Sequence, residues 1–185
     1  MFFPTTYYNI QQMFEKRKEY INSMAMIIAQ IIILSSFTRY FIIEPGRVDG
    51  PSMEPTFIDN EFFLINKAAY FFKSPERFDV VQVLVEGKYG RISVIKRIIG
   101  LPSERIVVEG GKIWIETADG KKTALDEPYL HYGTLTKVRF GAESRFTIPV
   151  NHYFIIGDNR GQSTDSRDIG SVHRKQINGQ VVQLN

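Results

Sequence analysis

The sequence predicts a mainly β protein that carries one apolar helix near its N-terminus. Two observations support this fold class. The 19 residues from Tyr20 to Thr38 contain no charged side chain, which is typical of one long apolar helix. After residue 43, short runs rich in β-branched and aromatic residues alternate with turn residues. The chain is therefore expected to divide into a helical segment and a β domain.

Size and composition limit the classes of protein to consider. With 185 residues, 43% of them hydrophobic and 23% charged, the chain is long enough for one folded domain with an added segment. The net charge of +3 is small and basic residues are mixed with acidic ones, which argues against a nucleic-acid-binding protein. The absence of cysteine excludes disulfides, thiol catalysis and cysteine-bound metals.

The uncharged run is predicted to be a transmembrane helix over residues 20–38. As a helix it extends about 28 Å, close to the hydrocarbon thickness of a bilayer. The basic cluster Lys16-Arg17-Lys18 precedes it, whereas only Arg39 follows directly, so residues 1–19 are expected in the cytoplasm and residues 39–185 outside. No A-x-A cleavage pattern of a secretory signal follows the run. A buried or interfacial helix is the alternative, because the run contains Gln30 and several other uncharged polar side chains.

The rest of the chain is predicted to form short strands. Gly110-Gly111 and Asp119-Gly120 separate some of the runs and are typical of hairpin turns. A short helical turn is expected within residues 66–76, before Pro75. The strand-like runs are Glu61–Asn66, Asp79–Val85, Ile92–Ile99, Arg105–Val108, Lys112–Ile115, Arg145–Ile148 and His152–Ile156.

The stretch Gly50–Thr56 lies shortly after the apolar run and contains a candidate nucleophile, Ser52. Pro51 and Pro55 fix their backbone φ angles, so Ser52 is expected in a rigid turn rather than in a helix or central strand. Without further evidence, an ordinary Pro-Ser turn is the alternative.

A serine hydroxyl needs a base to accept its proton. The three histidines, His131, His152 and His173, lie in turn-like or edge positions and are poor candidates. Lys96 differs from the other lysines because it interrupts an apolar strand-like run. Burial lowers the pKa of a lysine, so a buried Lys96 would act as a base, and an edge-strand lysine with a solvated tip is the alternative.

Two motif matches are rejected. Ser93-Val94-Ile95-Lys96 fits S-x-x-K of the penicillin-binding enzymes, but the accompanying S-D-N and K-T-G elements are missing. The polar stretch Gly157–Gly170 is rich in acidic residues, but it lacks the spacing of a calcium-binding loop. This stretch follows an apolar run and is interpreted as a functional loop, in which Asp165 can pair with Arg167. A solvated turn is the alternative.

Three stretches together resemble the type I signal peptidases, membrane-anchored bacterial serine proteases with a Ser-Lys dyad. Gly50–Thr56 is similar to the serine box of this family, Ile95–Pro102 to its lysine box, and Gly157–Arg167 to its glycine-aspartate-asparagine-arginine box. The order and spacing of the boxes also match, from about residue 21 to near the C-terminus. The resemblance implies a mostly antiparallel β-fold of the kind shared by signal peptidases and LexA.

The resemblance also implies a role for each matching residue. Ser52 is the nucleophile, with its backbone N–H as an oxyanion donor, and Lys96 is the general base. Ser163 holds Lys96 by a hydrogen bond, Asp165 and Arg167 stabilise the loop, and Met53 lies beside the dyad. Position 50, where some members supply a second oxyanion donor from a hydroxyl, is Gly50 here, so that donor is unidentified.

Two departures from the family pattern concern the fold rather than the dyad. Ser103 stands at a turn position that is usually glycine, and Phe78 replaces the common glycine before Asp79.

The expected function is removal of N-terminal signal peptides from exported preproteins, with small residues preferred at positions −1 and −3. The expected site is the bacterial cytoplasmic membrane, which a single-pass, monomeric enzyme would cross with its N-terminus inside. Its partners would be preproteins and the lipid bilayer, and neither a nucleic acid nor a metal or other cofactor is implied. A soluble Ser-Lys autoprotease of the LexA type and a catalytically inactive membrane-tethered binding domain are the alternatives.

Overall fold

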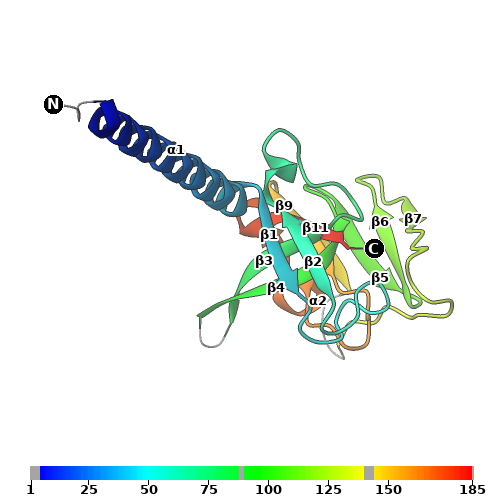
Figure 1. Cartoon of the computed structure of the whole chain (residues 1–185). Helices are drawn as coiled ribbons and strands as arrows, with labels where there is room; N and C mark the ends of the chain where they lie inside the picture. Colours follow the sequence, from blue (N-terminus) through cyan, green and yellow to red (C-terminus); the bar gives the residue numbers. More distant parts are fainter. Residues whose placement is uncertain (1–4, 88–89, 140–143, 185) are drawn as a thin grey trace. The chain divides into compact units, whose positions relative to one another are not determined.

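A computed structural model describes residues 5–87, 90–139 and 144–184. The chain forms two compact units, Met1–Ile42 and Ile43–Asn185, which are described separately (Figure 1). The boundary lies four residues after the predicted end of the membrane segment. The cytoplasmic and extracytoplasmic assignments of residues 1–19 and 39–185 remain predictions.

The first unit consists of one helix, α1 (Thr5–Phe41). Its part from Gln12 to Phe41 is long and apolar enough to cross a membrane, and none of that apolar stretch is buried. The predicted span of residues 20–38 lies entirely within it. The helix also contains residues 5–19, for which no helix is predicted. Because its isoleucine and leucine side chains are exposed, α1 lacks the burial expected of a core helix.

The second unit contains a seven-stranded sheet in which every neighbouring pair is antiparallel. The strand order is β1-β2-β11-β3-β4-β9-β10 (Figure 1). The strands are β1 (Ile43–Arg47), β2 (Phe62–Asn66), β3 (Val80–Gly87), β4 (Gly90–Gly100), β9 (His152–Ile156), β10 (Val172–His173) and β11 (Ile177–Gln183).

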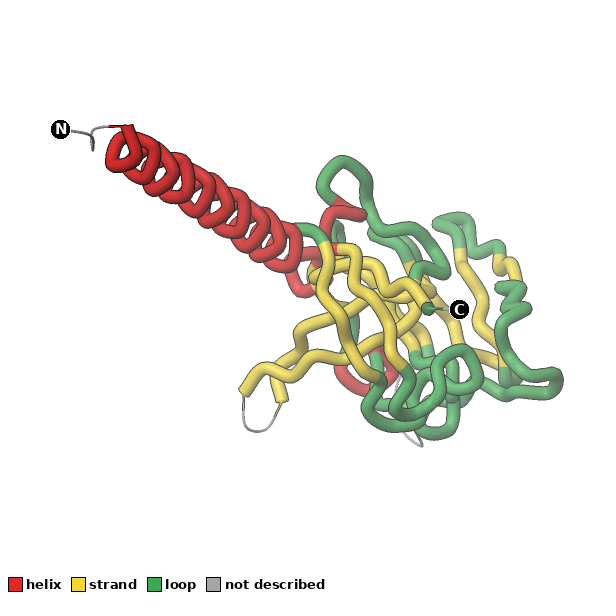
Figure 2. The backbone as a smooth tube through the Cα atoms, in the orientation of Figure 1, coloured by secondary structure: helices red, strands yellow, loops and turns green. Residues whose placement is uncertain are grey.

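A four-stranded antiparallel sheet has the order β7-β6-β5-β8. Its strands are β5 (Arg105–Glu109), β6 (Lys112–Glu116), β7 (Lys122–Ala124) and β8 (Arg145–Thr147). The short helices are η1 (Lys67–Tyr70), α2 (Ser166–Ile169) and η2 (Arg174–Gln176). Strands and loops thus make up almost all of this unit (Figure 2), and the predicted mainly antiparallel β class with one N-terminal apolar helix is confirmed.

The predicted strands correspond to β2, β3, β4, β5, β6, β8 and β9. Both predicted hairpin turns occur, and Gly110 and Gly111 adopt positive φ angles of 62° and 78° between β5 and β6. Four strands are absent from the prediction. β1 contains Pro45-Gly46 and β11 contains Asn178-Gly179, pairs that are typical of turns. β7 and β10 have only three and two residues, too few to show a pattern.

All three apolar clusters described in this unit contain residues of β4, the strand that carries Lys96. One includes Val83, Ile98 and Ile155 from β3, β4 and β9. Another includes Met53 of Gly50–Thr56, here called the serine turn, and the adjacent Phe57, packed with β2 residues such as Ile65. The serine turn is therefore fixed to the same sheet as the lysine strand, although 44 residues separate the two side chains in the sequence.

Both departures from the family pattern lie at left-handed backbone positions. Ser103 has φ 70° and Phe78 has φ 74°, a region that L-residues other than glycine rarely adopt. Phe78 gains a compensating contact, because its ring packs edge-on against Tyr129 with centroids 5.8 Å apart. Ser103 has a small, exposed side chain that makes no comparable packing contact.

Candidate active site

The residues Gly50–Thr56 form a turn, as their prolines predict. Gly50 has φ 88°, and its N–H donates to Asp59 Oδ1 at 2.8 Å. Met53 is fully buried, so the residue after Ser52 anchors the turn in the core. Ser52 itself is half-buried, and its carbonyl accepts a hydrogen bond of 3.1 Å from the N–H of Asn159. Turn, core and the 157–167 loop thus fix the position of Ser52.

Lys96 lies on β4, and its Nζ is 2.7 Å from Ser52 Oγ. The same amine is 2.9 Å from the carbonyl oxygen of Ile95. Lys96 is only 4% exposed, which rules out the alternative of a solvated edge lysine. The predicted dyad residues are therefore in hydrogen-bond contact.

Burial lowers the pKa of the Lys96 amine from its ordinary value. The charges of Asp165 and Asp158 act in the opposite direction, because they favour the ammonium form, but they do not outweigh desolvation. No carboxylate in the described chain forms an ion pair with Lys96. The Lys96 ammonium is therefore easier to deprotonate than that of an ordinary lysine.

Asp165 and Arg167 form a buried ion pair through two hydrogen bonds of 2.8 Å each. Burial alone would raise the pKa of Asp165, but the hydrogen bonds and charge of Arg167 hold it below its usual value. Asp165 Oδ2 also accepts from the N–H of Gly157 at 3.0 Å, and Arg167 donates to the carbonyl of Arg160. The pair thus holds both ends of the 157–167 loop together.

Ser163 lies in this loop, and its Oγ is buried without a hydrogen-bond partner among the described residues. The predicted hydrogen bond from Ser163 to Lys96 is therefore not formed in this structure. A Cβ placed on Gly157 would come within 2.2 Å of Ser163 Oγ and 2.5 Å of the Ser52 carbonyl oxygen. Ser163 and Ser52 thus approach Gly157 closely, and only glycine fits between them.

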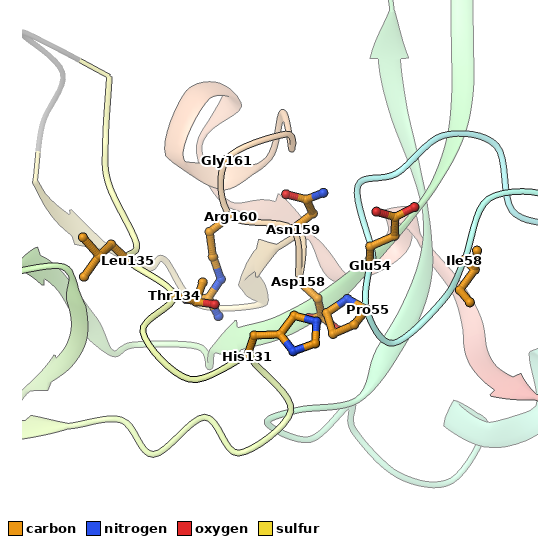
Figure 3. Close-up of a pocket in the computed structure, with 10 residues that line it drawn as sticks. All are labelled: Glu54, Pro55, Ile58, His131, Thr134, Leu135, Asp158, Asn159, Arg160 and Gly161. Atoms are coloured by element: carbon orange, nitrogen blue, oxygen red, sulfur yellow. The ribbon is translucent and has the colours of Figure 1, made fainter.

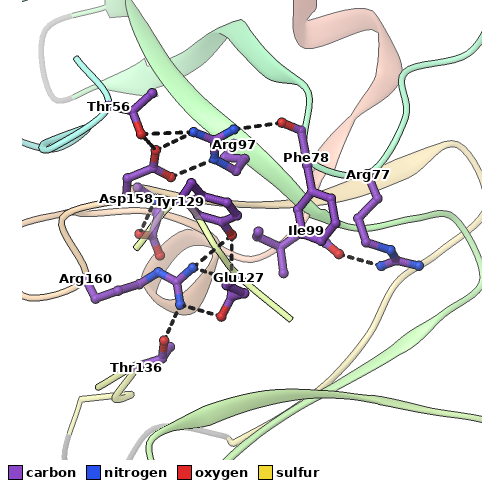
Figure 4. Close-up of polar contacts among 12 residues, drawn as sticks. Thr56, Arg77, Phe78, Arg97, Ile99, Glu127, Tyr129, Thr136, Asp158 and Arg160 are labelled. Atoms are coloured by element: carbon purple, nitrogen blue, oxygen red, sulfur yellow. Dashed lines mark hydrogen bonds and ion pairs between the residues drawn. The ribbon is translucent and has the colours of Figure 1, made fainter. Parts of the chain in front are cut away.

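Sequence reasoning missed a polar cluster that connects the three boxes. Arg97 donates to Asp158 through Nε at 2.9 Å and Nη2 at 2.5 Å, and both side chains are buried. Asp158 Oδ2 also accepts from Thr56 Oγ1 at 2.5 Å. Arg97 follows Lys96, Thr56 belongs to the serine turn, and Asp158 belongs to the loop of Ser163 (Figure 4). The cluster thus links the chain segments that carry the two dyad residues. The only sequence signal for it is that Arg97, Thr56 and Asp158 each lie within one of the three boxes.

A second polar cluster lies beside the first (Figure 4). Arg160 contacts Glu127 with both terminal nitrogens and also contacts Thr136. Tyr129 donates to Glu127 at 2.6 Å, and its ring lies 4.0 Å from the Arg97 guanidinium carbon. These contacts attach the segment between β7 and β8 to the loop that follows β9.

A cavity of about 410 Å³ contains both Ser52 and Lys96 in its wall. One side is formed by β1 and the residues after it, the other by β4. Its apolar lining is Val48, Phe63, Ile65, Ile92, Val94 and Ile95. These side chains line the space beside Ser52 and Lys96. The sequence alone does not identify them.

Another cavity, of about 620 Å³, lies on the Glu54-Pro55 side of the serine turn (Figure 3). His131 lies in its wall, together with Asn159 and Gly161. His152 and His173 stack edge-on with ring centroids 5.0 Å apart. None of the three histidines bonds to Ser52 in the described structure, which agrees with their low ranking as bases. No group of three His, Cys, Asp or Glu side chains in the described ranges is arranged to hold a metal.

The Ser52 N–H makes no hydrogen bond within the described part of the chain, so it is available to an incoming oxyanion. The N–H of Gly50 is occupied by Asp59. Gly50 therefore serves as a turn residue in this structure, and the second oxyanion donor is unassigned.

Comparisons with known proteins relate this chain to one family. A family model for signal peptidase, peptidase S26, matches residues 19–184. Signal peptidase I V of Bacillus subtilis is 35% identical, covering 81% of this chain and 90% of its own. Signal peptidase I P of Bacillus subtilis subsp. natto is 31% identical, covering 89% and 88%. The crystal structure of a signal peptidase I from Enterococcus faecalis is 28% identical, with a TM-score of 0.44, and covers 61% of this chain and 98% of its own.

Proposed function

The chain belongs to the signal peptidase family, peptidase S26, and on that premise we propose that it removes signal peptides with Ser52 as nucleophile and Lys96 as general base. Its activity is that of a serine endopeptidase of the signal peptidase I type. The observation that carries the dyad is the 2.7 Å contact between Lys96 Nζ and Ser52 Oγ, made by a buried amine. Membership of this family argues against the LexA-type alternative.

Acylation begins with Lys96 in its neutral form. Its Nζ accepts the proton of Ser52 Oγ–H while Oγ forms a bond to the scissile carbonyl carbon. The Lys96 ammonium then gives this proton to the departing amine as the C–N bond breaks. The mature protein leaves with a new N-terminal amine, and the signal peptide stays attached to Ser52 as an ester.

Deacylation uses the same amine, which is neutral again after the first product leaves. Lys96 accepts a proton from a water molecule, whose oxygen attacks the ester carbonyl. The C–Oγ bond breaks, Ser52 regains its proton, and the signal peptide leaves as a carboxylic acid. Both steps place negative charge on the carbonyl oxygen, which the free N–H of Ser52 would stabilise by about 2.7–4 kcal/mol.

The substrate would bind as an added β-strand. β1 is an edge strand, and residues 90–96 of β4 pair only with β3 in the described chain, because β9 pairs with β4 from Arg97 onward. Both unpaired edges border the cavity that contains the dyad. An extended peptide between them would gain main-chain hydrogen bonds, as in other β-augmentation complexes.

We expect small side chains at positions −1 and −3 of the substrate. Alternate residues of an added strand point to the same face, so both would point toward the apolar side chains around Ser52 and Lys96. Phe63, Ile65 and Ile95 are among the residues that line this cavity. Small apolar residues would pack against them.

The proposal includes a membrane anchor. α1 is long enough to span the bilayer, and the basic cluster at residues 16–18 favours a cytoplasmic N-terminus in the bacterial cytoplasmic membrane. The catalytic unit would then act outside the cytoplasm as a monomer. Anchoring raises the effective concentration of the site near preproteins that emerge from the same membrane.

A preprotein with an Ala-x-Ala site, incubated with the full chain in detergent, tests the dyad. Ser52→Ala and Lys96→Met should each lower the cleavage rate by at least about 10³-fold, because each removes one partner of the proton transfer. Lys112→Met, at an exposed lysine of β6, is the matched control and should cleave normally. Cleavage by Lys96→Met at the control rate would reject Lys96 as the base, and cleavage by Ser52→Ala would reject the nucleophile.

A further inference from the structure

The cavity of about 620 Å³ beside the serine turn is not used in the proposed mechanism. Its wall comes from three segments, within residues 54–58, 131–135 and 158–161 (Figure 3). Its volume lies in the range of about 300–1,000 Å³ that is typical of ligand-binding cavities. We call it the second cavity, and the cavity that contains Ser52 and Lys96 the dyad cavity.

The second cavity begins next to the nucleophile. Glu54 lines it and follows Ser52 by two positions, a distance of at most about 7 Å along the chain. Asn159 also lines it, and the N–H of Asn159 donates to the Ser52 carbonyl oxygen at 3.1 Å. Ser52 itself lies in the wall of the dyad cavity. The nucleophile is therefore in one cavity and directly beside the other.

A preprotein in extended conformation needs space on both sides of Ser52. In the proposed function, the residues before the scissile bond lie between β1 and β4 in the dyad cavity. The residues after the bond continue beyond Ser52 at about 3.3 Å per residue. Because the second cavity begins within about two such steps, it can accommodate the first residues of the mature chain.

One side chain in the wall of the second cavity carries a charge that is not compensated. Asp158 is paired with Arg97, and Arg160 is paired with Glu127. Glu54 is half-buried and forms no ion pair among the described residues. A carboxylate in a partly enclosed site attracts cationic groups and repels anionic ones more strongly than a carboxylate in open solvent. The wall therefore discriminates between side chains by their charge.

We propose that the second cavity binds positions +1 to +3 of the preprotein, the first residues of the mature chain, and that Glu54 selects among them by charge. Lysine or arginine is favoured at these positions, and aspartate or glutamate is disfavoured. This inference rests on the proposed function, because it needs a substrate whose scissile bond lies at Ser52. Glu54 determines specificity and takes no part in the proton transfer.

Peptides that share one Ala-x-Ala signal segment and differ only after the scissile bond test the charge preference. Positions +1, +2 and +3 carry Lys, Gln or Glu in turn, and kcat/KM is measured with the full chain in detergent at low salt. We expect about five- to tenfold faster cleavage with Lys than with Glu at one or more of these positions, because an attractive pair replaces a repulsive one. Added salt should reduce this ratio.

Variants of Glu54 show whether this carboxylate is the cause. Glu54→Gln should reduce the Lys-to-Glu ratio to about one, and Glu54→Lys should invert it. Glu76→Gln, at an exposed position before β3, is the matched control and should keep the wild-type ratio. A purely structural role of Glu54 would change the cleavage of all peptides equally. Equal cleavage of the Lys and Glu peptides by the wild type, or an unchanged ratio in Glu54→Gln, would overturn the charge selection.

A variant at Gly161 tests whether the mature chain enters the second cavity. A Cβ added at Gly161 meets no atom within 4 Å, and the backbone there is outside the left-handed region, so a large side chain is tolerated. Gly161→Trp should lower kcat/KM by about tenfold for a peptide that extends to position +5, because the indole takes the space of the substrate. A peptide that ends in an amide at position +1 should be cleaved as by the wild type.

Gly161→Ala adds only a methyl group and serves as the control for both peptides. Equal effects of Gly161→Trp on the long and the short peptide, or no effect on either, would overturn binding of the mature chain in the second cavity.

Two results separate this inference from the proposed function. If the wild type cleaves none of the peptides, both are wrong. If cleavage depends on Ser52 and Lys96 but not on the residues after the scissile bond, only the role of the second cavity is contradicted.

Discussion

Lys96 and Arg97 are adjacent basic residues on one strand, both nearly buried, yet their surroundings differ. Arg97 binds the carboxylate of Asp158 through two nitrogens and also donates to Thr56 and to the carbonyl of Phe78. Among the described residues, Lys96 forms hydrogen bonds only with the hydroxyl of Ser52 and the carbonyl oxygen of Ile95. The exposed fractions are 4% for Lys96 and 8% for Arg97, so burial alone does not distinguish them.

The difference lies in compensation of charge. A buried guanidinium with a carboxylate partner remains charged and holds chain segments together. A buried ammonium without such a partner loses part of its preference for the charged form, so its pKa falls. In the proposed mechanism, one strand therefore supplies the base and, at the next position, a structural cation that fixes the base relative to the serine turn.

Replacing Lys96 with arginine, the residue at position 97, should have the largest effect on the cleavage rate. In Lys96→Arg the guanidinium keeps its proton at all accessible pH values, so it cannot accept one from Ser52. We expect at least about 10³-fold slower cleavage of an Ala-x-Ala preprotein. Lys112→Arg on β6 serves as the control, and activity of Lys96→Arg within tenfold of this control would contradict a proton-accepting role.

Removing the partner of Arg97 should mainly affect stability. Asp158→Asn leaves a buried guanidinium without a carboxylate, which should lower the free energy of unfolding by about 3–5 kcal/mol. Chemical denaturation of the full chain in detergent measures the loss. Asp126→Asn, at an exposed position, is the control. An equally small change in both variants would mean that the Arg97–Asp158 pair does not hold the boxes together.

These two residues also illustrate how far sequence reasoning extends. The motifs predict Ser52, Lys96, Asp165 and Arg167 as site residues, because the chemistry of each box limits the residue types that serve it. The link of Arg97 to Asp158 was missed, because 61 residues separate them and only the sheet pairing of β4 with β9 brings them together.

The fold was predictable to a similar extent. Runs of β-branched residues identified the central strands, whose apolar faces decide their structure. β1 and β11 were not predicted, because Pro45-Gly46 and Asn178-Gly179 are locally turn-like and tertiary pairing overrides this preference. β1 forms one wall of the cavity that contains Ser52 and Lys96. Because β1 is not predicted from the sequence, this cavity is not predicted either.

Ser163→Ala tests whether the Ser163 hydroxyl acts on Lys96 during the reaction. The Ser163 hydroxyl is buried and makes no hydrogen bond of normal geometry among the described residues, although it helps to hold the pKa of Asp165 low, so its removal should change the free energy of unfolding only slightly. If the hydroxyl bonds to Lys96 when substrate binds, cleavage should slow by about tenfold, the effect of roughly 1.4 kcal/mol. Ser171→Ala, in the wall of a neighbouring cavity that also contains Lys96, is the control. Unchanged kcat and KM in Ser163→Ala would exclude Ser163 from the reaction.

The uncompensated burial of Lys96 should appear in the pH dependence of stability. The lowered pKa means that the unfolded chain binds more protons than the native chain between that lowered value and about 10.5, so stability rises with pH across this window. Lys96→Met removes this slope and should be the more stable protein at pH 7. Urea titrations of both proteins at several pH values measure it, and parallel curves would contradict a lowered pKa.

The smallest expected effect concerns the turn at Ser103. Glycine tolerates a φ of 70° that strains serine, so Ser103→Gly should raise the free energy of unfolding by up to about 1 kcal/mol. Phe78→Gly relieves similar backbone strain but loses the ring contact with Tyr129, and it should destabilise. Thermal unfolding measures the stability of the two variants. A loss of stability in Ser103→Gly would contradict backbone strain at Ser103.

The most direct test of the account is an NMR titration of the Lys96 side chain in the full chain labelled with ¹³C-lysine, with Lys96→Met used to assign its signal. The account predicts that the Lys96 ε-carbon titrates at a clearly lower pH than the exposed lysines, such as Lys112. A Lys96 signal that titrates together with theirs, near the ordinary lysine pKa of about 10.4, would contradict it.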